Sequence, residues 1–317
     1  MRIIDFNAGY IEQAALIAKQ NYDIEREFVP TLPLVDKLPP LTEFVDNGFG
    51  VAAFDGDAMT GFLCSVSPFP NAFDSTDATG VFSPLGANGA VGKRRAEVYS
   101  RMYQAAGEKW VSAGAGSHAI CLFAHDKEVL EQFFRCGFGL RCVDAIRDMG
   151  QIPVPNHSAY RFKELARSEY TSVFPLSLML NRHQCESPFF MKRKPETPES
   201  FAESCIKCGS RFFAATHGGK ICAYLKVLCD GENFIAETNG YIHIGGAFCL
   251  PEHRGKGVFQ RLLNYAVSIL KSDGYTRLGV DFESINPVAW GFWRKYFDVY
   301  THSVVRRIDE FAVVNKR

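Results

Sequence analysis

The stretch LPEHRGKGVFQRLL, residues 250–263, joins a short turn holding two cations and two glycines to the start of an amphipathic pattern. From Val258 onward, apolar residues recur at the spacing of one buried helical stripe. The first N–H groups of a helix have no partner within it, and the helix dipole adds partial positive charge there. The glycines permit positive φ and close approach of the main chain to an anion, while Arg254 and Lys256 add charge. The stretch therefore predicts an anion-binding turn at a helix N-terminus.

The totals of the chain make this basic turn a local feature. Thirty-five Lys and Arg balance thirty-five Asp and Glu among 317 residues, so there is no bulk field to attract nucleic acid or an anionic membrane. Hydrophobic residues make up 47% of the chain, without an apolar run of the roughly eighteen residues that span a bilayer. The N-terminus offers no secretory signal, and ten scattered cysteines are typical of reduced thiols. We expect a globular cytoplasmic protein with neither nucleic-acid nor membrane partners, and its oligomeric state stays open.

The order of elements indicates a mixed α/β fold of two domains. GVAAFDGDAMTGFLCSV, residues 50–66, reads as two strands joined by a hairpin, and EVYSRMYQAAGEKWVSAG, residues 97–114, reads as a helix that ends at glycine. The stretch 151–159 carries two prolines and is typical of a linker. We therefore predict an N-terminal domain over 1–150 and a C-terminal domain over 160–317.

An internal repeat supports this division. Ala52–Leu63 aligns with Ala214–Leu225, and GSHAICLFAHDKEVLEQFFRCGF, residues 116–138, aligns with GYTRLGVDFESINPVAWGFWRKYF, residues 274–297. Because both pairs keep the same order along the chain, the pattern favours a duplicated domain.

Other motifs are weaker. A nucleotide P-loop needs Ser or Thr after its lysine, whereas Lys256 is followed by glycine and Lys93 by arginine. Cys205 and Cys208 form a CxxC, but neither a second CxxC nor a His pair accompanies them at the spacing of a zinc site. We therefore predict no metal.

The turn at 254–258, between a strand that ends at Pro251 and an amphipathic helix, resembles the acyl-CoA signature of the GNAT N-acetyltransferase superfamily. That loop reads Gln/Arg-x-x-Gly-x-Gly/Ala in the family. Arg254 and Gly257 match it, and Phe259 stands at the last small position.

A second motif carries the resemblance further. NPVAWGFWRKYF, residues 286–297, is similar to the family's Asn-x-x-Ala-x-x-(Phe/Leu)-Tyr helix through Asn286, Ala289 and Phe292. The first half resembles the same fold through its hairpin, its FFRCGFG helix end and its CVDAIRDM strand, but its loop PLGANGAVGKRR matches the cofactor signature poorly. The resemblance implies a mixed α/β fold of two tandem GNAT-like domains, each a mostly antiparallel mixed sheet flanked by helices, with the cofactor motif only in the C-terminal copy.

The resemblance implies acetyl-CoA as co-substrate. Backbone groups near the end of the strand YIHIGGAFCL, residues 241–250, are expected to pair with the pantetheine arm like an added strand, and the adjacent glycines at 245–246 are a place for a bulge. The residues expected to bind the cofactor are Phe248, Cys249, Arg254, Gly255, Lys256, Gly257, Val258, Phe259, Asn286 and Trp293.

Amine acetylation also needs a base and benefits from an acid. His243 occupies the strand position that a catalytic Glu holds in many GNAT enzymes, and imidazole titrates near neutrality. Asp281 and Glu283 end the strand RLGVDFES, where carboxylates can hold a cationic amine or relay its proton. The family's Tyr acid is replaced by Trp293, so that Tyr296 is the nearby phenol.

The sequence thus predicts an acetyl-CoA-dependent N-acetyltransferase whose C-terminal domain is active. The alternative is a non-catalytic protein in which CoA regulates an interaction surface. A third possibility is that the first domain also binds a cofactor. The acceptor, a small-molecule or peptide amine, stays open.

Overall fold

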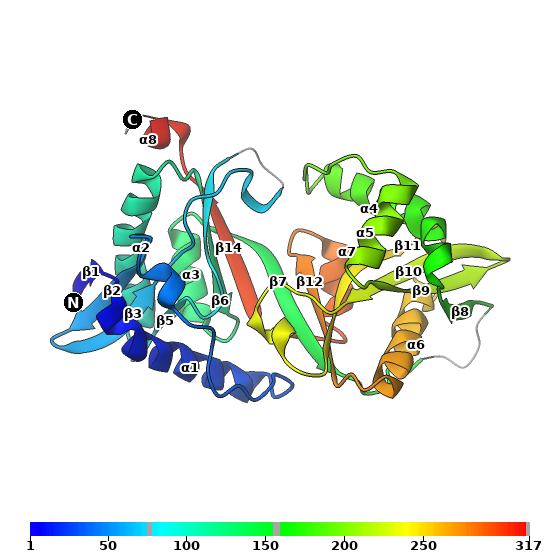
Figure 1. Cartoon of the computed structure of the whole chain (residues 1–317), viewed down its shortest axis with the longest axis horizontal. Coiled ribbons are helices and arrows are strands. Elements are labelled where there is room, and N and C mark those ends of the chain that lie inside the picture. Colours follow the sequence, from blue (N-terminus) through cyan, green and yellow to red (C-terminus); the bar gives the residue numbers. More distant parts are fainter. Residues whose placement is uncertain (75–77, 155–158, 315–317) are drawn as a thin grey trace. The chain divides into compact units, whose positions relative to one another are not determined.

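The computed structural model describes residues 1–74, 78–154 and 159–314, and the chain forms two compact units (Figure 1). The first unit combines Met1–Asp144 with Val299–Arg317, and the second is Ala145–Asp298. The predicted linker 151–159 lies inside the second unit, and its residues 155–158 lie outside the described ranges. The prediction that 160–317 forms one domain differs from this division, because the C-terminal segment belongs to the first unit.

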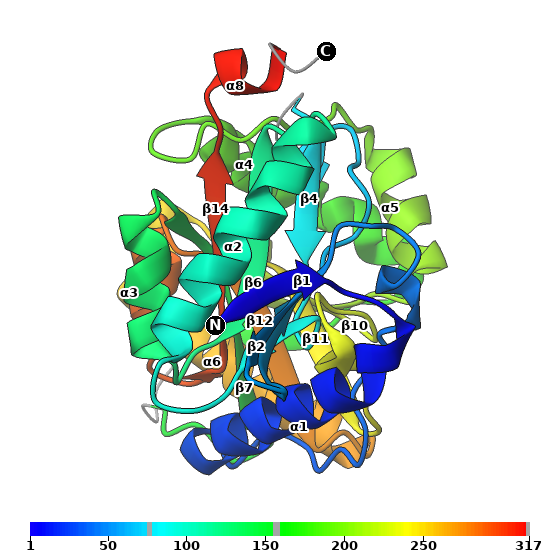
Figure 2. The ribbon, with the colours of Figure 1, turned by 90° about the vertical axis from the view of Figure 1, so that its left-hand side faces the viewer.

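One sheet of the first unit is antiparallel, in the order β1 (Arg2–Asp5), β2 (Val51–Asp55), β3 (Ala58–Leu63) and β5 (Asn88–Ala90). The predicted hairpin is confirmed: β2 and β3 are joined at Gly56, whose φ is 59°. Figure 2 shows this sheet between α1 (Ile11–Phe28) and α2 (Arg95–Ser112). Alternate residues of β2 serve the two helices, since Val51 and Ala53 share a core with α2 while Ala52 and Phe54 share one with α1.

The other sheet of the first unit is completed from the far end of the chain. β4 (Gly80–Ser83) pairs in parallel with β6 (Ser117–Phe123), and β14 (Thr301–Arg307) lies antiparallel between β6 and β7 (Gly139–Asp148), as Figure 1 shows. The alternating pattern of 301–307 is typical of a strand, but the partners of a strand depend on tertiary packing. This is why the sequence alone assigned the segment to the wrong domain.

The second unit contains β8 (Arg161–Glu164), β9 (Arg211–His217), β10 (Lys220–Leu228) and β11 (Tyr241–Cys249), which are antiparallel neighbours, and β12 (Arg277–Glu283), which is parallel to β11. The last residues of β7 lie in this unit, where β7 is the neighbour of β12.

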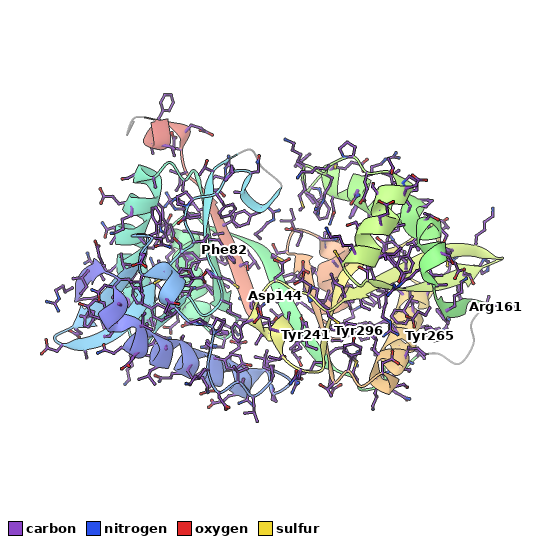
Figure 3. The ribbon with its side chains drawn as sticks, viewed as in Figure 1. Phe82, Asp144, Arg161, Tyr241, Tyr265 and Tyr296 are labelled. Carbon is purple, nitrogen blue, oxygen red and sulfur yellow. The ribbon has the colours of Figure 1, made fainter. Side chains whose placement is uncertain are left out.

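Helices cover both faces of that sheet. On one face lies α6 (Val258–Ser272), whose Tyr265 is labelled in Figure 3. The ring of Tyr265 packs against Phe162 and Phe213, and Leu262 and Leu263 of the same helix are fully buried. Each such leucine contributes roughly 1.5–3 kcal/mol of burial free energy, which fixes α6 on the sheet. On the other face α4 (Phe174–Cys185) contacts β11 and β10, and α5 (Pro198–Lys207) shares a core with β9 and β10.

The remaining elements are short. The other helices are α3 (Lys127–Arg135), α7 (Pro287–Trp293) and α8 (Glu310–Val314), and the remaining strand is β13 (Asp298–Val299). The 3-10 segments are Ala8–Tyr10, Thr42–Phe44, Ala72–Asp74, Arg167–Val173, Phe234–Glu237 and Pro251–His253.

The predicted repeat has a structural counterpart. Both aligned hairpin segments form hairpins, β2–β3 and β9–β10, and both later segments form a buried strand followed by a helix, β6–α3 and β12–α7. The mixed α/β fold with two units is therefore confirmed. No helix in the described ranges combines the length and the apolar character that a membrane span requires.

Candidate functional site

The strand β11 separates from β12 halfway along its length. The parallel pairing runs from Tyr241 to Ile244 and ends there, and the ladder with β10 shifts register between Lys226 and Val227, so that Gly245 is an extra residue. A Cβ on Gly245 would lie 2.5 Å from Cδ2 of Leu228, which explains the need for glycine. The bulge predicted at 245–246 is thus confirmed. Among the described residues, no strand pairs with 245–249 on the side towards β12.

The turn at 254–257 has the backbone that its glycines predict. Gly255 and Gly257 have φ of 71° and 70°, and α6 begins at Val258 directly after them. Because the N-cap of α6 is glycine, it has no side chain to occupy the first-turn N–H groups. These donors and the positive end of the helix dipole form an anion cradle.

Arg254 folds back from this turn onto the end of β11. Its Nε donates to the carbonyl oxygen of Cys249 at 2.9 Å, and its guanidinium lies 5.3 Å from the ring centroid of Phe248. The side chain is thereby held at the cradle, and the other N–H donors of its guanidinium can contact a ligand. Lys256, by contrast, is exposed and does not line the adjoining cavity.

A cavity of about 390 Å³, here called the helix-side groove, runs along the cradle and the open edge of β11. It brings together most of the predicted cofactor residues and one predicted catalytic residue: Phe248, Cys249, Arg254, Gly255, Gly257, Val258, Phe259, Asn286, Trp293 and Tyr296. The groove therefore assembles residues from both sequence motifs and from β11.

Aromatic packing closes the groove on the α7 side. The ring of Phe259 lies edge-on to Phe292 at 5.2 Å and to Trp293 at 5.9 Å, so it packs on α7. Asn286 caps α7, because its Oδ1 accepts from the N–H groups of Val288 and Ala289. Its side chain is thus partly committed to the helix.

Tyr296 follows α7 and lines the same groove (Figure 3). Partial burial raises the pKa of its phenol above the ordinary value of 10, so the group is protonated at neutral pH. Burial likewise raises the pKa of the Cys249 thiol to about 11, which keeps that neighbour uncharged as well. The groove thus contains a proton donor and no thiolate from this cysteine.

A second cavity of about 390 Å³, the strand-end pocket, opens between the separated strands. Asp281 and Glu283 line it at the end of β12, as the sequence predicts. It shares five lining residues with the helix-side groove: Leu180, Ala247, Asn286, Ala289 and Trp293. The two cavities therefore meet beside the bulge in β11.

His243 lies behind this pocket and does not line it. Its side chain is 5% exposed, and its Nε2 lies 2.7 Å from Oδ1 of Asp281, whose side chain is 32% exposed. Its Nδ1 lies 2.9 Å from the hydroxyl of Tyr241. A carboxylate only accepts, so Nε2–H donates to Asp281, while Nδ1 and the Tyr241 hydroxyl share a second hydrogen bond that holds the ring from its other side. The carboxylate, and not the predicted imidazole, is the member of this pair that reaches the pocket.

Negative charge gathers around the pair. Loss of surrounding solvent and then the negative charge of Asp281 raise the pKa of Glu232, while His243 opposes the rise. In the parts of the chain that the structure describes, no group of three or more His, Cys, Asp or Glu is arranged to hold a metal ion. The cysteines of the CxxC are free thiols, with Cys205 buried and Cys208 exposed.

Some lining residues escaped the sequence reasoning. Leu180 and His183 come from α4, whose sequence carries no motif. Lys226 and Arg193 bring positive charge to the strand-end pocket. Lys226 had a detectable signal, since it interrupts the otherwise apolar run ICAYLKVL of β10.

In the first unit, two separate strands, β4 and β5, correspond to the two parts of β11, and side chains fill the gap between their strand sets. β4 pairs in parallel with β6, and β5 pairs with β3. Asn88 bridges the two strand sets, because its Nδ2 donates to the carbonyl of Cys121 at 3.1 Å and to Oγ of Ser83 at 3.0 Å. The hydroxyl of Tyr99 donates to Oδ1 of Asn88 at 2.8 Å.

The helix that follows in the first unit also lacks an open cradle. α2 begins behind Arg94, whose φ is −108°, where α6 has a glycine at 70°. Arg94 pairs with Glu97 at 2.6 Å, and Arg95 pairs with Asp126 at 2.7 Å. Both arginines of this turn are engaged by the unit's own carboxylates.

Comparisons with known proteins agree with this geometry. Residues 177–298 match the family model described as the acetyltransferase (GNAT) family. A GCN5-related N-acetyltransferase from Sphaerobacter thermophilus has a TM-score of 0.56 at 11% identity, with 96% of this chain and 95% of that chain covered. At this identity the similarity concerns the fold, which therefore extends over both units.

Two further solved structures are similar at lower scores. A tandem GNAT protein from the clavulanic acid biosynthesis pathway has a TM-score of 0.45 at 14% identity, with 96% of this chain and 98% of that chain covered. An acetyltransferase of the GNAT family from Colwellia psychrerythraea has a TM-score of 0.45 at 11% identity, with 98% and 100% covered. No curated protein matches the chain by sequence. The family match spans the cradle, the open edge of β11 and both cavities, and it identifies residues 177–298 as a segment of the acetyltransferase (GNAT) family.

Proposed function

We propose that the chain is an acetyl-CoA-dependent N-acetyltransferase and that its second unit carries the site. The observation that carries the proposal is the position of the helix-side groove, which lies against both the start of α6 and the open edge of β11. A helix N-terminus suits the diphosphate of CoA, and an open strand edge suits the amides of its pantetheine arm.

The residues present fit this ligand. Gly255 and Gly257 have positive φ with no heavy atom near the place of a Cβ, so the main chain is bare where an anion would approach. Arg254 adds a fixed cation at the same turn. Phe248 and Cys249 would present backbone groups to the arm. Among the described strands, this part of β11 pairs only with β10, so its opposite edge is open.

Acetyl-CoA supplies a thioester whose acyl carbon an uncharged amine attacks. Asp281 takes one proton from the ammonium form of the acceptor, and His243 holds that carboxylate in place through Nε2–H. The N–C bond then forms, and the C–S bond breaks with its electron pair going to sulfur. As the amide forms, the nitrogen loses its second proton and the sulfur gains one, so that protons balance. The Tyr296 phenol at the groove is the group that can deliver the proton to sulfur, and it is restored by the proton that the nitrogen releases.

A non-catalytic CoA-binding protein is the second candidate. Its supporting observation is Trp293, an indole in the position where the family's phenol is expected, which cannot supply a proton. Tyr296, which lines the same groove, is a phenol that can supply this proton in an enzyme.

The test is calorimetric and kinetic. We expect wild-type protein to bind acetyl-CoA and to release free thiol from it when a pool of amines is added. Arg254→Glu should weaken acetyl-CoA binding at least tenfold, because it reverses the charge at the cradle. Lys271→Glu, the same charge change at the exposed far end of α6, is the control and should bind normally.

The outcomes separate the candidates. Thiol release above background with amines supports the enzyme, and binding without release supports the regulatory protein. Unchanged acetyl-CoA binding by Arg254→Glu would contradict the assignment of the cradle.

The acceptor in this proposal is a small-molecule or peptide amine, and the compartment is the cytoplasm. All ten cysteines are free thiols, which suits a reducing compartment.

A further inference from the structure

The strand-end pocket carries charges of both signs on opposite strands. Its anionic side is Asp281 and Glu283 at the end of β12. Its cationic side is Lys226 of β10 and Arg193 of the segment between α4 and α5, with Glu196 nearby. Because β11 lies between β10 and β12, the two sides face each other across one strand.

The Lys226 stem on the cationic side lies against the glycines of the bulge. Cε of Lys226 lies 3.3 Å from the place of a Cβ on Gly245 and 3.6 Å from that on Gly246. The lysine stem therefore passes over β11 at these two glycines, and a Cβ on Gly245 would crowd it. The positive charge of Lys226 opposes the rise in pKa that burial causes at Cys205, so its ammonium lies near that wall of the pocket.

These cations are not neutralised by neighbours. In the part of the chain that the structure describes, no carboxylate forms an ion pair with Lys226 or with Arg193. Holding an unpaired lysine in a half-enclosed pocket costs free energy, and an incoming anion would recover it. The site is thus complementary to a negative group on the ligand.

The anionic side lies where the amine must react. Asn286, Ala289 and Trp293 belong to both cavities, so an ammonium group at Asp281 is beside the groove proposed for the acyl donor. The hydrogen bond from His243 fixes one oxygen of that carboxylate. An amine bound here is positioned to lose its proton and attack.

We propose, resting on the acetyl-transfer function above, that the acceptor is an amine that also bears a carboxylate, of the amino-acid class. Its ammonium group binds Asp281 and Glu283, and its carboxylate binds Lys226 and Arg193. The volume of about 390 Å³ lies within the range of small-molecule sites and leaves room for an amino acid or a dipeptide. Polyamines are disfavoured, because their further charges would meet the two cations.

The experiment compares acceptors that differ only in the carboxylate. Free L-amino acids and the matching amino-acid amides are offered with acetyl-CoA, together with spermidine, and thiol release is followed. We expect kcat/KM to be at least tenfold higher for the best free acid than for its amide. An amide or spermidine that is acetylated as well as every free acid would overturn the proposal.

Variants then assign the preference to its residue. Lys226→Met keeps the stem and removes the charge, and it should raise KM for the acid at least tenfold without changing KM for acetyl-CoA. Lys226→Arg should restore most of the preference. Lys220→Met, at the exposed start of the same strand and outside both cavities, is the matched control. A preference that survives intact in Lys226→Met would refute the role of this lysine.

Two further readouts keep the test decisive. If Lys226→Met does not fold, Arg193→Gln on the exposed segment replaces it, with the same expected loss of acid preference. Absence of acetyl transfer to any amine, with acetyl-CoA bound, would count against the proposed function itself. Transfer without acid preference would count only against the acceptor class.

Discussion

Nε2 of His243 lies 2.7 Å from Oδ1 of Asp281, and this contact places a carboxylate, not an imidazole, at the wall of the strand-end pocket. The ring is held from its other side by Tyr241 at 2.9 Å. A side chain so fixed orients its partner more readily than it exchanges protons with a ligand.

The first prediction separates the members of this pair. Asp281→Asn should lower kcat for acetyl transfer by about 100-fold or more, because it removes the group that takes the amine proton. His243→Gln should lower kcat less and shift the pH dependence of kcat, since it acts through Asp281. Acetyl-CoA affinity, measured by calorimetry, should change in neither variant. Full activity in Asp281→Asn would remove this carboxylate from the reaction.

The second prediction concerns the glycine that starts α6. Gly257→Val should weaken acetyl-CoA binding at least tenfold, because its φ of 70° is strained for a β-branched residue and the side chain covers the cradle. Gly274→Val, at a φ of 93° in open space after the same helix, is the control for strain. Both variants should lose stability in a thermal melt, and only the first should lose binding. Equal binding by the two would show that the cradle is not the site.

The third prediction is the binding stoichiometry. We expect one acetyl-CoA per chain by calorimetry, because Asn88 and Tyr99 fill the strand opening of the first unit and Arg95 is paired with Asp126. Two molecules per chain, with the second lost in an Arg95→Glu variant, would show instead that the first unit opens to a ligand.

The fourth prediction concerns acid stability. Burial lowers the pKa of His118 to about 4 from its ordinary 6.5, and Tyr103 and the carbonyl of Ala115 hold the neutral ring. The folded state therefore binds this proton less tightly than the unfolded state does. The contribution of the neutral His118 ring to the free energy of unfolding is complete above pH 6.5. It falls by about 3 kcal/mol in all as the pH drops through the folded-state pKa of about 4.

Urea unfolding of wild-type protein and His118→Gln at pH 7.5 and at pH 4 measures this effect. The variant should be less stable than wild type at pH 7.5, because a packed ring is lost, and should lose less stability on acidification. An equal loss of stability in both proteins would mean that His118 does not contribute to the destabilisation at low pH.

The turn and the helix of the opening stretch could be predicted because they depend on local chemistry. Gly255 and Gly257 adopt positive φ readily because they lack a Cβ, and the apolar stripe of α6 follows from its spacing. The same holds for the bulge at Gly245, where adjacent glycines interrupt a strand.

Features that depend on distant partners were less accessible. The burial of His243 behind Asp281 follows from the pairing of β11 with β12, which no local pattern specifies. Lys226 could be noticed as a charge in an apolar strand, but its path across Gly245 needs the tertiary structure. The placement of β14 was wrong for the same reason.

The insertion of β14 between β6 and β7 has a consequence for synthesis of the protein. The strands β6 and β7 are synthesised long before β14. The sheet of the first unit therefore lacks the strand between them while the whole second unit is translated. Val304, which is fully buried in the sheet, is translated after all of the second unit. A chain that stopped after Asp298 would therefore lack a strand of the first unit and none of the second, and it would leave the facing edges of β6 and β7 open to pairing with other chains.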